Sequence, residues 1–170
     1  MKCAVLCNGP SRTDYVDATP YEFVIGCNIP WTKVDATVVL DESVIDYWYK
    51  NQSCIDVPVY FSRKAWMYAD SIRKRPFFER YMIELVDTLP EYDSSGHQAT
   101  RCCLRKGATE IDIYGCDSWF DQTIVSHTHQ YVKNLNPDDS KKHVIGWRTR
   151  WTELMNSNPS VNFNFIRKYK

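Results

Sequence analysis

Three short apolar runs near the amino terminus constrain the fold of this chain more than any other feature. They cover residues 3–7, 23–27 and 36–40, and each ends at a small polar residue or a turn. A continuous apolar run of about five residues, bounded by turn residues, is typical of a strand buried on both faces of a parallel sheet. Because the runs follow one another closely, the connections between these strands must be short.

Helix-like and strand-like patterns alternate along the rest of the chain. Apolar side chains recur at helical spacing over residues 42–50, 65–73 and 144–156. Apolar runs typical of strands cover residues 57–61, 108–116 and 161–166. Residues 81–89 fit a strand or a helix, and we expect loops at residues 73–80 and 134–142.

The clearest helix start lies at residues 94–98. Ser95 as the N-cap and Gln98 three residues later form a capping box, and Gly107 suits the turn that ends this helix. A strand follows almost at once. The order of elements predicts a Rossmann-like α/β fold with a doubly wound, mostly parallel sheet and flanking helices. We expect one domain over residues 1–170, in which residues 167–170 form a basic tail.

Composition argues against several classes of function. The 21 basic and 21 acidic side chains give a formal net charge of +0, so we expect no nucleic acid partner. The 7 cysteines include no CxxC pair, which argues against a zinc knuckle or a thioredoxin-type site. We see neither a signal-peptide pattern nor an apolar run of about 18 residues, and therefore expect a cytoplasmic protein without a membrane span.

Polar residues follow four of the predicted strands. They are the turn at residues 8–11, Asn28, Asp41 and Asp117. In a doubly wound fold, ligands bind outside the carboxyl ends of the strands. We therefore expect these residues to converge on one edge of the sheet, next to the start of the helix at Ser95.

Two of these segments could hold an anion. Gly9 allows close approach of the backbone, and the amides and the Ser11 hydroxyl could bind a phosphate or a ribose. The alternative is an ordinary strand-to-helix turn, since the segment is neither a GxGxxG motif nor a P-loop. Residues 94–97 open a helix whose free amides suit an anion or a nucleobase carbonyl, and the alternative there is capping alone.

Three histidines are further candidates. His127 and His129 are two residues apart and could bind a metal ion from one face of a strand. No third ligand stands at a recognisable spacing, so a solvated loop pair is favoured and we expect no metal site. His143 precedes a helix and could act as a general base, the alternative being a surface histidine.

Four segments, taken in order, resemble the bacterial sialyltransferases of glycosyltransferase family 42. They are residues 7–11, residues 27–28, the helix start at residues 94–96 with the segments at 107–111 and 114–117, and residues 143–146. The order and approximate spacing hold over most of this chain, which is shorter than a typical member. A related superfamily of bacterial and phage proteins has similar Gly-Pro-Ser and Ser-Gly-His segments.

The resemblance implies a fold of Rossmann type, CMP-sialic acid as the donor, and no required metal or other cofactor. By position, residues 8–11 and Asn28 would hold the donor nucleotide, and Asp41 stands where the family has an asparagine near the donor. Residues 94–96 would contact the cytidine or its phosphate. The expected nucleotide-binding set is Asn8, Gly9, Pro10, Ser11, Asn28, Asp41, Ser94, Ser95, Gly96, His97 and Asp117.

The chain differs from the family at the positions of the family's catalytic residues. Trp147 stands at the position of the catalytic histidine, directly after Ile-Gly in the last motif. Ser118 or Trp119 stands near the position of a tyrosine that steadies the departing phosphate. An indole can donate a hydrogen bond but cannot accept a proton, so another residue would have to be the base. His143, His127 or His129 could take this role, and His143 is the expected catalytic residue.

Three functions follow as expectations. The first is a sialyltransferase-like protein that binds a CMP-sugar and transfers the sugar to an unknown acceptor by direct displacement. The second is a non-catalytic nucleotide-binding or protein-interaction module on the same fold. The third and weakest is a pterin pyrophosphokinase-like phosphotransferase, which would need a divalent metal at Asp41 and Asp117. A homo-oligomer is compatible with all three.

Overall fold

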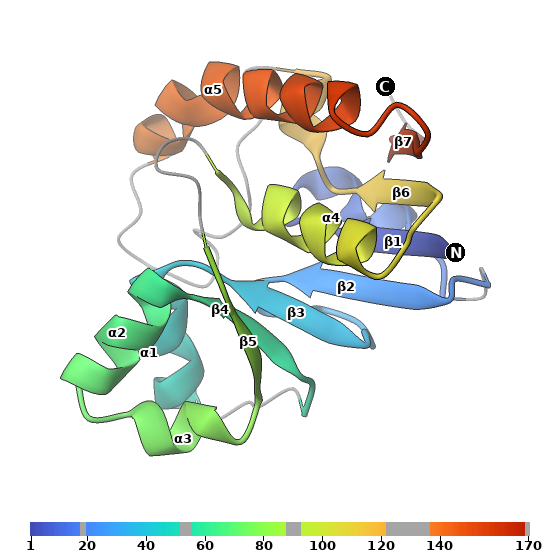
Figure 1. The fold of residues 1–170 in the computed structure, drawn as a ribbon. Helices are drawn as coiled ribbons and strands as arrows, with labels where there is room; N and C mark the ends of the chain where they lie inside the picture. Colours follow the sequence, from blue (N-terminus) through green and yellow to red (C-terminus); the bar gives the residue numbers. More distant parts are fainter. Residues whose placement is uncertain (18–19, 52–55, 88–92, 122–136, 169–170) are drawn as a thin grey trace.

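The computed structural model describes residues 1–17, 20–51, 56–87, 93–121 and 137–168, with only the backbone for residues 137–143. A single seven-stranded sheet lies at its centre (Figure 1). Its strands are β1 (Lys2–Leu6), β2 (Phe23–Cys27), β3 (Ala36–Val39), β4 (Val59–Ser62), β5 (Met82–Val86), β6 (Glu110–Tyr114) and β7 (Asn162–Ile166).

All six strand pairings in this sheet are parallel, and the strand order is β5-β4-β3-β2-β1-β6-β7. The chain therefore builds one side of the sheet outward from β1 and then returns to the other side of β1 with β6. This order confirms the predicted doubly wound, Rossmann-like fold.

Helices cover both faces of the sheet (Figure 1). Helices α4 and α5 lie over one face, and α1, α2 and α3 lie over the other face at the β3–β5 side. Two 3-10 turns, η1 and η2, follow β1 and β6. The bounds are η1 (Pro10–Asp14), α1 (Glu42–Asn51), α2 (Arg63–Ser71), α3 (Arg75–Glu79), α4 (Ser95–Arg105), η2 (Asp117–Trp119) and α5 (Pro137–Asn156).

Alternation along β1 explains why the first apolar run is continuous. Cys3 and Val5 pack under α4 and α5, whereas Ala4 and Leu6 face the cluster on the opposite side of the sheet. These four residues are at most 3% exposed. A central strand covered on both faces needs apolar side chains at every position.

The connections after β1 and β2 are as short as the sequence predicts. Between β1 and β2 the described residues contain only the 3-10 turn η1, and no helix lies between β2 and β3. Asn28 begins the second connection in the left-handed backbone region, with φ 60°. Asparagine tolerates this conformation better than most residues, and it turns the chain back along the sheet.

Three predicted boundaries are wrong. The N-cap of α4 is Ser94 rather than Ser95, because the imidazole of His97 takes the place expected for the Gln98 side chain. Residues 75–79 form helix α3, with Pro76 in the first turn, where a missing N–H costs nothing. Helix α5 begins at Pro137, inside the predicted loop. Pro58 directly precedes β4, which is an inner strand, and β5 forms the sheet edge.

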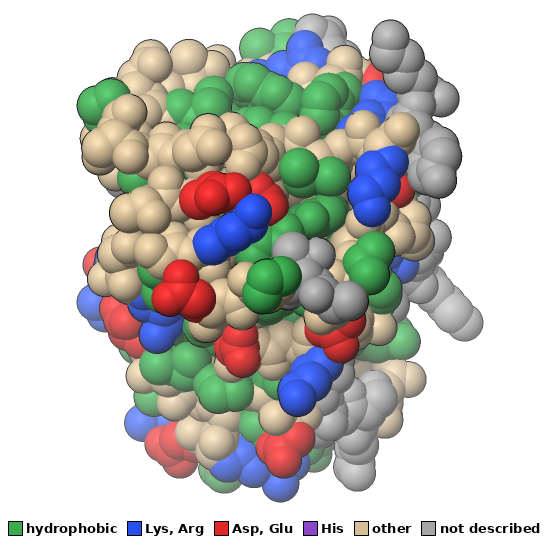
Figure 2. Space-filling model, turned by 90° about the vertical axis from the view of Figure 1, so that its right-hand side faces the viewer, with side chains coloured by type: hydrophobic (Ala, Val, Ile, Leu, Met, Phe, Trp, Pro, Cys, Tyr) green, Lys and Arg blue, Asp and Glu red, His purple; other side chains and the backbone are tan. Residues whose placement is uncertain are grey.

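Charged side chains of both signs share the face at the amino ends of the strands (Figure 2). Acidic, basic and hydrophobic groups alternate over this view, and no area of one sign dominates it. Within the described ranges, no helix combines the length and the apolarity that crossing a bilayer would need.

Candidate functional site

The polar residues after β1 and β2 lie side by side. Leu6 pairs with Gly26, so two residues further on Asn8 is level with Asn28. Adjacent strands are about 4.8 Å apart, which places the two asparagines close together at the carboxyl edge. Because β1 is flanked by β2 and β6, this is also the point at which a doubly wound sheet binds ligands.

The turn after β1 is bonded to the turn after β6. The Gly9 N–H donates to the Gly115 carbonyl (2.7 Å), and the Ser11 N–H donates to the Asp117 carboxylate (2.8 Å). The Ser11 hydroxyl accepts from the Gly115 N–H (3.2 Å). Asp117 is only 3% exposed, so it shapes this turn from inside. Pro10, by contrast, is exposed at its surface.

Asn28 connects the end of β2 to the start of α4. The Ser95 hydroxyl donates to Oδ1 of Asn28 (3.2 Å), and the Asn28 carbonyl accepts from the Thr37 hydroxyl (2.9 Å). Asn28 is 3% exposed and Ser95 is 8% exposed. The two residues therefore form a fixed polar layer beneath the carboxyl edge.

The amino terminus of α4 sits directly on the end of β1. A Cβ on Gly96 would lie 2.8 Å from the sulfur of Cys7 and 3.3 Å from Trp151, so only glycine allows this approach. The amides of Ser95 and Gly96 are in the first turn and have no acceptor within the helix. Together with the helix dipole they favour an anion at this end.

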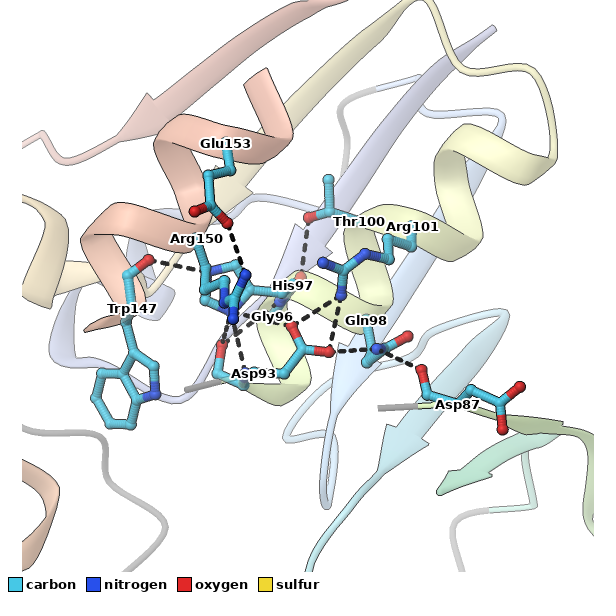
Figure 3. A network of polar contacts seen from close by, with 11 residues as sticks. Asp87, Asp93, Gly96, His97, Gln98, Thr100, Arg101, Trp147, Arg150 and Glu153 are labelled. Atoms are coloured by element: carbon cyan, nitrogen blue, oxygen red, sulfur yellow. Dashed lines mark hydrogen bonds and ion pairs between the residues drawn. The ribbon is translucent and has the colours of Figure 1, made fainter. Parts of the chain in front are cut away.

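The buried side chain of His97 holds the start of α4 in place (Figure 3). Its Nδ1 accepts from the Ser94 backbone N–H (3.0 Å), which places the ring proton on Nε2. Nε2 then donates to the carbonyl of Trp147 in α5 (3.1 Å). Burial lowers the pKa of His97 to about 4, so the ring is neutral at pH 7. His97 is 0% exposed and both ring nitrogens are bonded within the protein, so the structure shows it holding the helix start in place; its predicted contact with the nucleotide stays a prediction.

An ion pair holds the segment before α4 (Figure 3). Both carboxylate oxygens of Asp93 accept from Nη1 of Arg101 at 2.8 Å, and the Gln98 side chain donates to the same carboxylate. The Asp93 side chain is 1% exposed, whereas that of Arg101 is 23% exposed. Sequence reasoning missed Asp93, whose place before a capping serine gave no signal of burial.

Asn8 differs from its neighbours because its side chain is buried but makes no hydrogen bond within the described part of the chain. The residue is 7% exposed, and its amide has no hydrogen-bond partner among the described residues. A buried amide without a partner costs about 1–3 kcal/mol, and such groups in native proteins call for an explanation. A ligand that pairs with this amide at the carboxyl edge would supply one.

Asp41 lies at the carboxyl end of β3 and is exposed. Desolvation by the surrounding protein nevertheless raises the pKa of its carboxyl above the usual range. Three strand spacings separate β3 from β6, so Asp41 and Asp117 stand about 14 Å apart across the sheet. They cannot ligate one magnesium ion together. In the part of the chain that the structure describes, no three His, Cys, Asp or Glu side chains gather as they would around a metal.

Sequence reasoning also missed a groove between η2 and α5. Trp119, Arg148 and Thr152 are among the residues that line it, and its volume is about 470 Å³. The remaining candidates cannot be placed in the same way. His127 and His129 lie outside the described residues, and His143 is described only as part of the α5 backbone.

Comparison of the chain with protein-family models, curated proteins and solved structures gave no match.

Proposed function

We propose that this protein binds a CMP-sugar at the carboxyl edge of β1 and β2 and transfers the sugar without a metal ion. The observation that carries the proposal is the buried amide of Asn8, which has no hydrogen-bond partner among the residues that the structure describes. A side-chain amide has both hydrogen-bond donors and an acceptor, which can pair with the donors and acceptors on the edge of a nucleobase. The first-turn amides of Ser95 and Gly96 would receive the phosphate.

In this proposal the protein's own groups drive a direct displacement at the sugar. The acceptor hydroxyl loses its proton to His143 in α5, and its oxygen attacks the anomeric carbon as the bond to the nucleotide phosphate breaks. The amides at the start of α4 stabilise the negative charge on the departing phosphate. The resemblance to family 42 supports CMP as the leaving group.

Binding without turnover is the second candidate. Trp147 motivates it, because this residue occupies the position of the family's base and its carbonyl is already bonded to His97. A tryptophan cannot accept the proton of an acceptor hydroxyl. The protein would then keep a nucleotide site as a binding module.

A thermal-shift screen tests the binding step. The panel holds CMP, CMP-sialic acid, UDP- and GDP-sugars, and ATP with Mg²⁺. A ligand at 100 times its Kd stabilises by about 2.7 kcal/mol, a rise of several degrees in Tm for a domain of this size. A rise confined to the cytidine ligands supports the proposal, and no rise with any of them rejects it.

Release of CMP from the donor then separates the two candidates. Turnover by the wild type that is lost in His143→Ala supports transfer. Wild-type protein that binds CMP-sialic acid and never releases CMP supports the binding module. Turnover that depends on Mg²⁺ and ATP would instead favour the pyrophosphokinase alternative, against which the separation of Asp41 and Asp117 argues.

A further inference from the structure

The groove between η2 and α5 is large enough to hold a small molecule. Its lining residues are Trp119, Ile145, Arg148, Thr149 and Thr152, and its volume of about 470 Å³ lies within the usual range for small-molecule sites. Ile145 is 69% exposed, so the groove opens to solvent. Trp119 follows Asp117 by two residues, which puts the groove beside the turn that borders the nucleotide site.

Arg148 supplies a positive charge that no acidic side chain among the described residues neutralises. Its Nε donates to the Ser118 carbonyl (2.8 Å) and its Nη2 donates to the Trp119 carbonyl (2.6 Å). These bonds use two of the five N–H groups of a guanidinium. No carboxylate among the described residues pairs with Arg148. The charge is held in place by neutral carbonyls, and it is available to an anion.

The other lining residues suit a sugar ring. The indole of Trp119 is stacked on Phe165, with ring centroids 4.6 Å apart and planes at 14°. This contact fixes the indole as a flat apolar surface at the groove. The hydroxyls of Thr149 and Thr152 donate to carbonyls of α5 at 3.1 and 3.0 Å, so each keeps acceptor capacity for a sugar hydroxyl.

We propose that this groove binds an acidic saccharide, with the carboxylate accepting from Arg148 and the sugar ring lying against Trp119. A planar carboxylate matches the fork of N–H groups on a guanidinium. The assignment of this saccharide as the acceptor rests on the proposed function. It follows from the shared helix α5, which carries four of the five groove residues and also His143. The same helix carries the Trp147 carbonyl that is bonded to His97 of α4.

Saturation-transfer NMR titrations with glucuronate and glucose test the proposal, using the full chain and matched variants. Ile145 stands at the open side of the groove, so Ile145→Glu adds a repelling charge without disturbing the core. Ile145→Lys is the control that places the opposite charge at the same position. Met67→Glu, at a residue 70% exposed on α2, controls for net charge. We expect glucuronate to bind more tightly than glucose, and Ile145→Glu to weaken it about tenfold.

Four results would overturn the proposal. They are equal affinity for glucuronate and glucose, wild-type affinity in Ile145→Glu, equal weakening by Ile145→Lys, and binding of inorganic phosphate as tight as that of glucuronate. CMP-induced thermal shifts on the same variants keep the two sites apart. If glucuronate binds but CMP causes no thermal shift, the groove proposal stands and the nucleotide site is rejected. If CMP causes a shift but glucuronate does not bind, only the groove proposal is rejected.

Discussion

The Nε2 atom of His97 lies 3.1 Å from the carbonyl oxygen of Trp147, and this one bond joins the start of α4 to the middle of α5. The same ring accepts from Ser94 through Nδ1 and packs on Trp151, with centroids 4.3 Å apart. A neutral imidazole thereby fixes two helices around the candidate site. Its protonation state must therefore matter for folding.

We predict that His97 causes the free energy of unfolding to decrease as the pH is lowered. Burial lowers its pKa from 6.5 to about 4, so folding favours the neutral ring. The stability from this group is complete above pH 6.5 and is lost as the pH falls toward 4. The shift corresponds to about 3 kcal/mol. Urea unfolding between pH 7.5 and 4.5 measures the loss.

His97→Phe isolates this contribution from that of the carboxylates. The variant loses both hydrogen bonds of the ring and is less stable at pH 7.5, by about 2–4 kcal/mol. Its stability should fall less steeply between pH 6.5 and 4.5 than that of the wild type. Parallel pH dependences in the two proteins would contradict the assignment.

Asn8 should be required for binding and unfavourable for stability. We expect Asn8→Leu to abolish the CMP-induced thermal shift while the free protein stays as stable or gains about 1 kcal/mol, because an unpaired buried amide is removed. That gain corresponds to about 2–4 °C in Tm. A large loss of stability would show that the amide has a structural partner.

Ser62→Ala is the matched control for Asn8. Ser62 is 1% exposed, and its hydroxyl donates to the Leu40 carbonyl (2.9 Å) and accepts from the Ala65 N–H (3.0 Å). Removing this paired hydroxyl should cost about 1 kcal/mol and leave the CMP shift unchanged. The two variants together separate a binding residue from a structural one.

Gly9 should tolerate no side chain, for a reason specific to its position. A Cβ there would lie within 3.0 Å of the Asp117 carboxylate and the Gly115 carbonyl, both of which are fixed. Gly9→Ala should push the β1 turn away from β6 and remove CMP binding. Gly107→Ala has open space but a φ of +85°, and it should cost about 1 kcal/mol with binding intact. Equal thermal-shift responses in both variants would argue against a role for the turn.

The strands were predictable because burial on both faces leaves a continuous apolar run. The runs at residues 3–7, 23–27 and 36–40 match β1, β2 and β3 closely, and β6 follows α4 as predicted. Polar residues directly after these strands then had to lie at one edge of a parallel sheet. The neighbouring positions of Asn8 and Asn28 follow from this pattern alone.

The roles of individual polar residues were not predictable, because they depend on contacts that are distant in sequence. His97 was expected to contact a ligand, yet its Nε2–H donates a hydrogen bond to a carbonyl 50 residues away. Arg148 gave no signal at all, since its partners are the backbone carbonyls of Ser118 and Trp119. Helix α3 was missed because Pro76 marks a loop in most contexts but fits a first helical turn.

The buried thiols should be unreactive in the folded protein. All six cysteines in the described ranges are buried and free of disulfides. Burial raises the pKa of Cys102 to about 11, and a hydrogen bond that the Cys116 thiol makes to Cys7, together with burial, raises the pKa of Cys116. At pH 8 Cys102 then carries about 100-fold less thiolate than an ordinary cysteine, even before its lack of access is considered.

Iodoacetamide labelling followed by peptide mass spectrometry measures this protection. We expect Cys102 to label slowly at pH 8 in buffer and rapidly in urea, where the thiol regains its ordinary pKa and access. Cys7 lies under Gly96, so its labelling reports opening of the α4 start itself. CMP should slow the labelling of Cys7 if it binds there, and an unchanged rate at saturating CMP would place the nucleotide elsewhere.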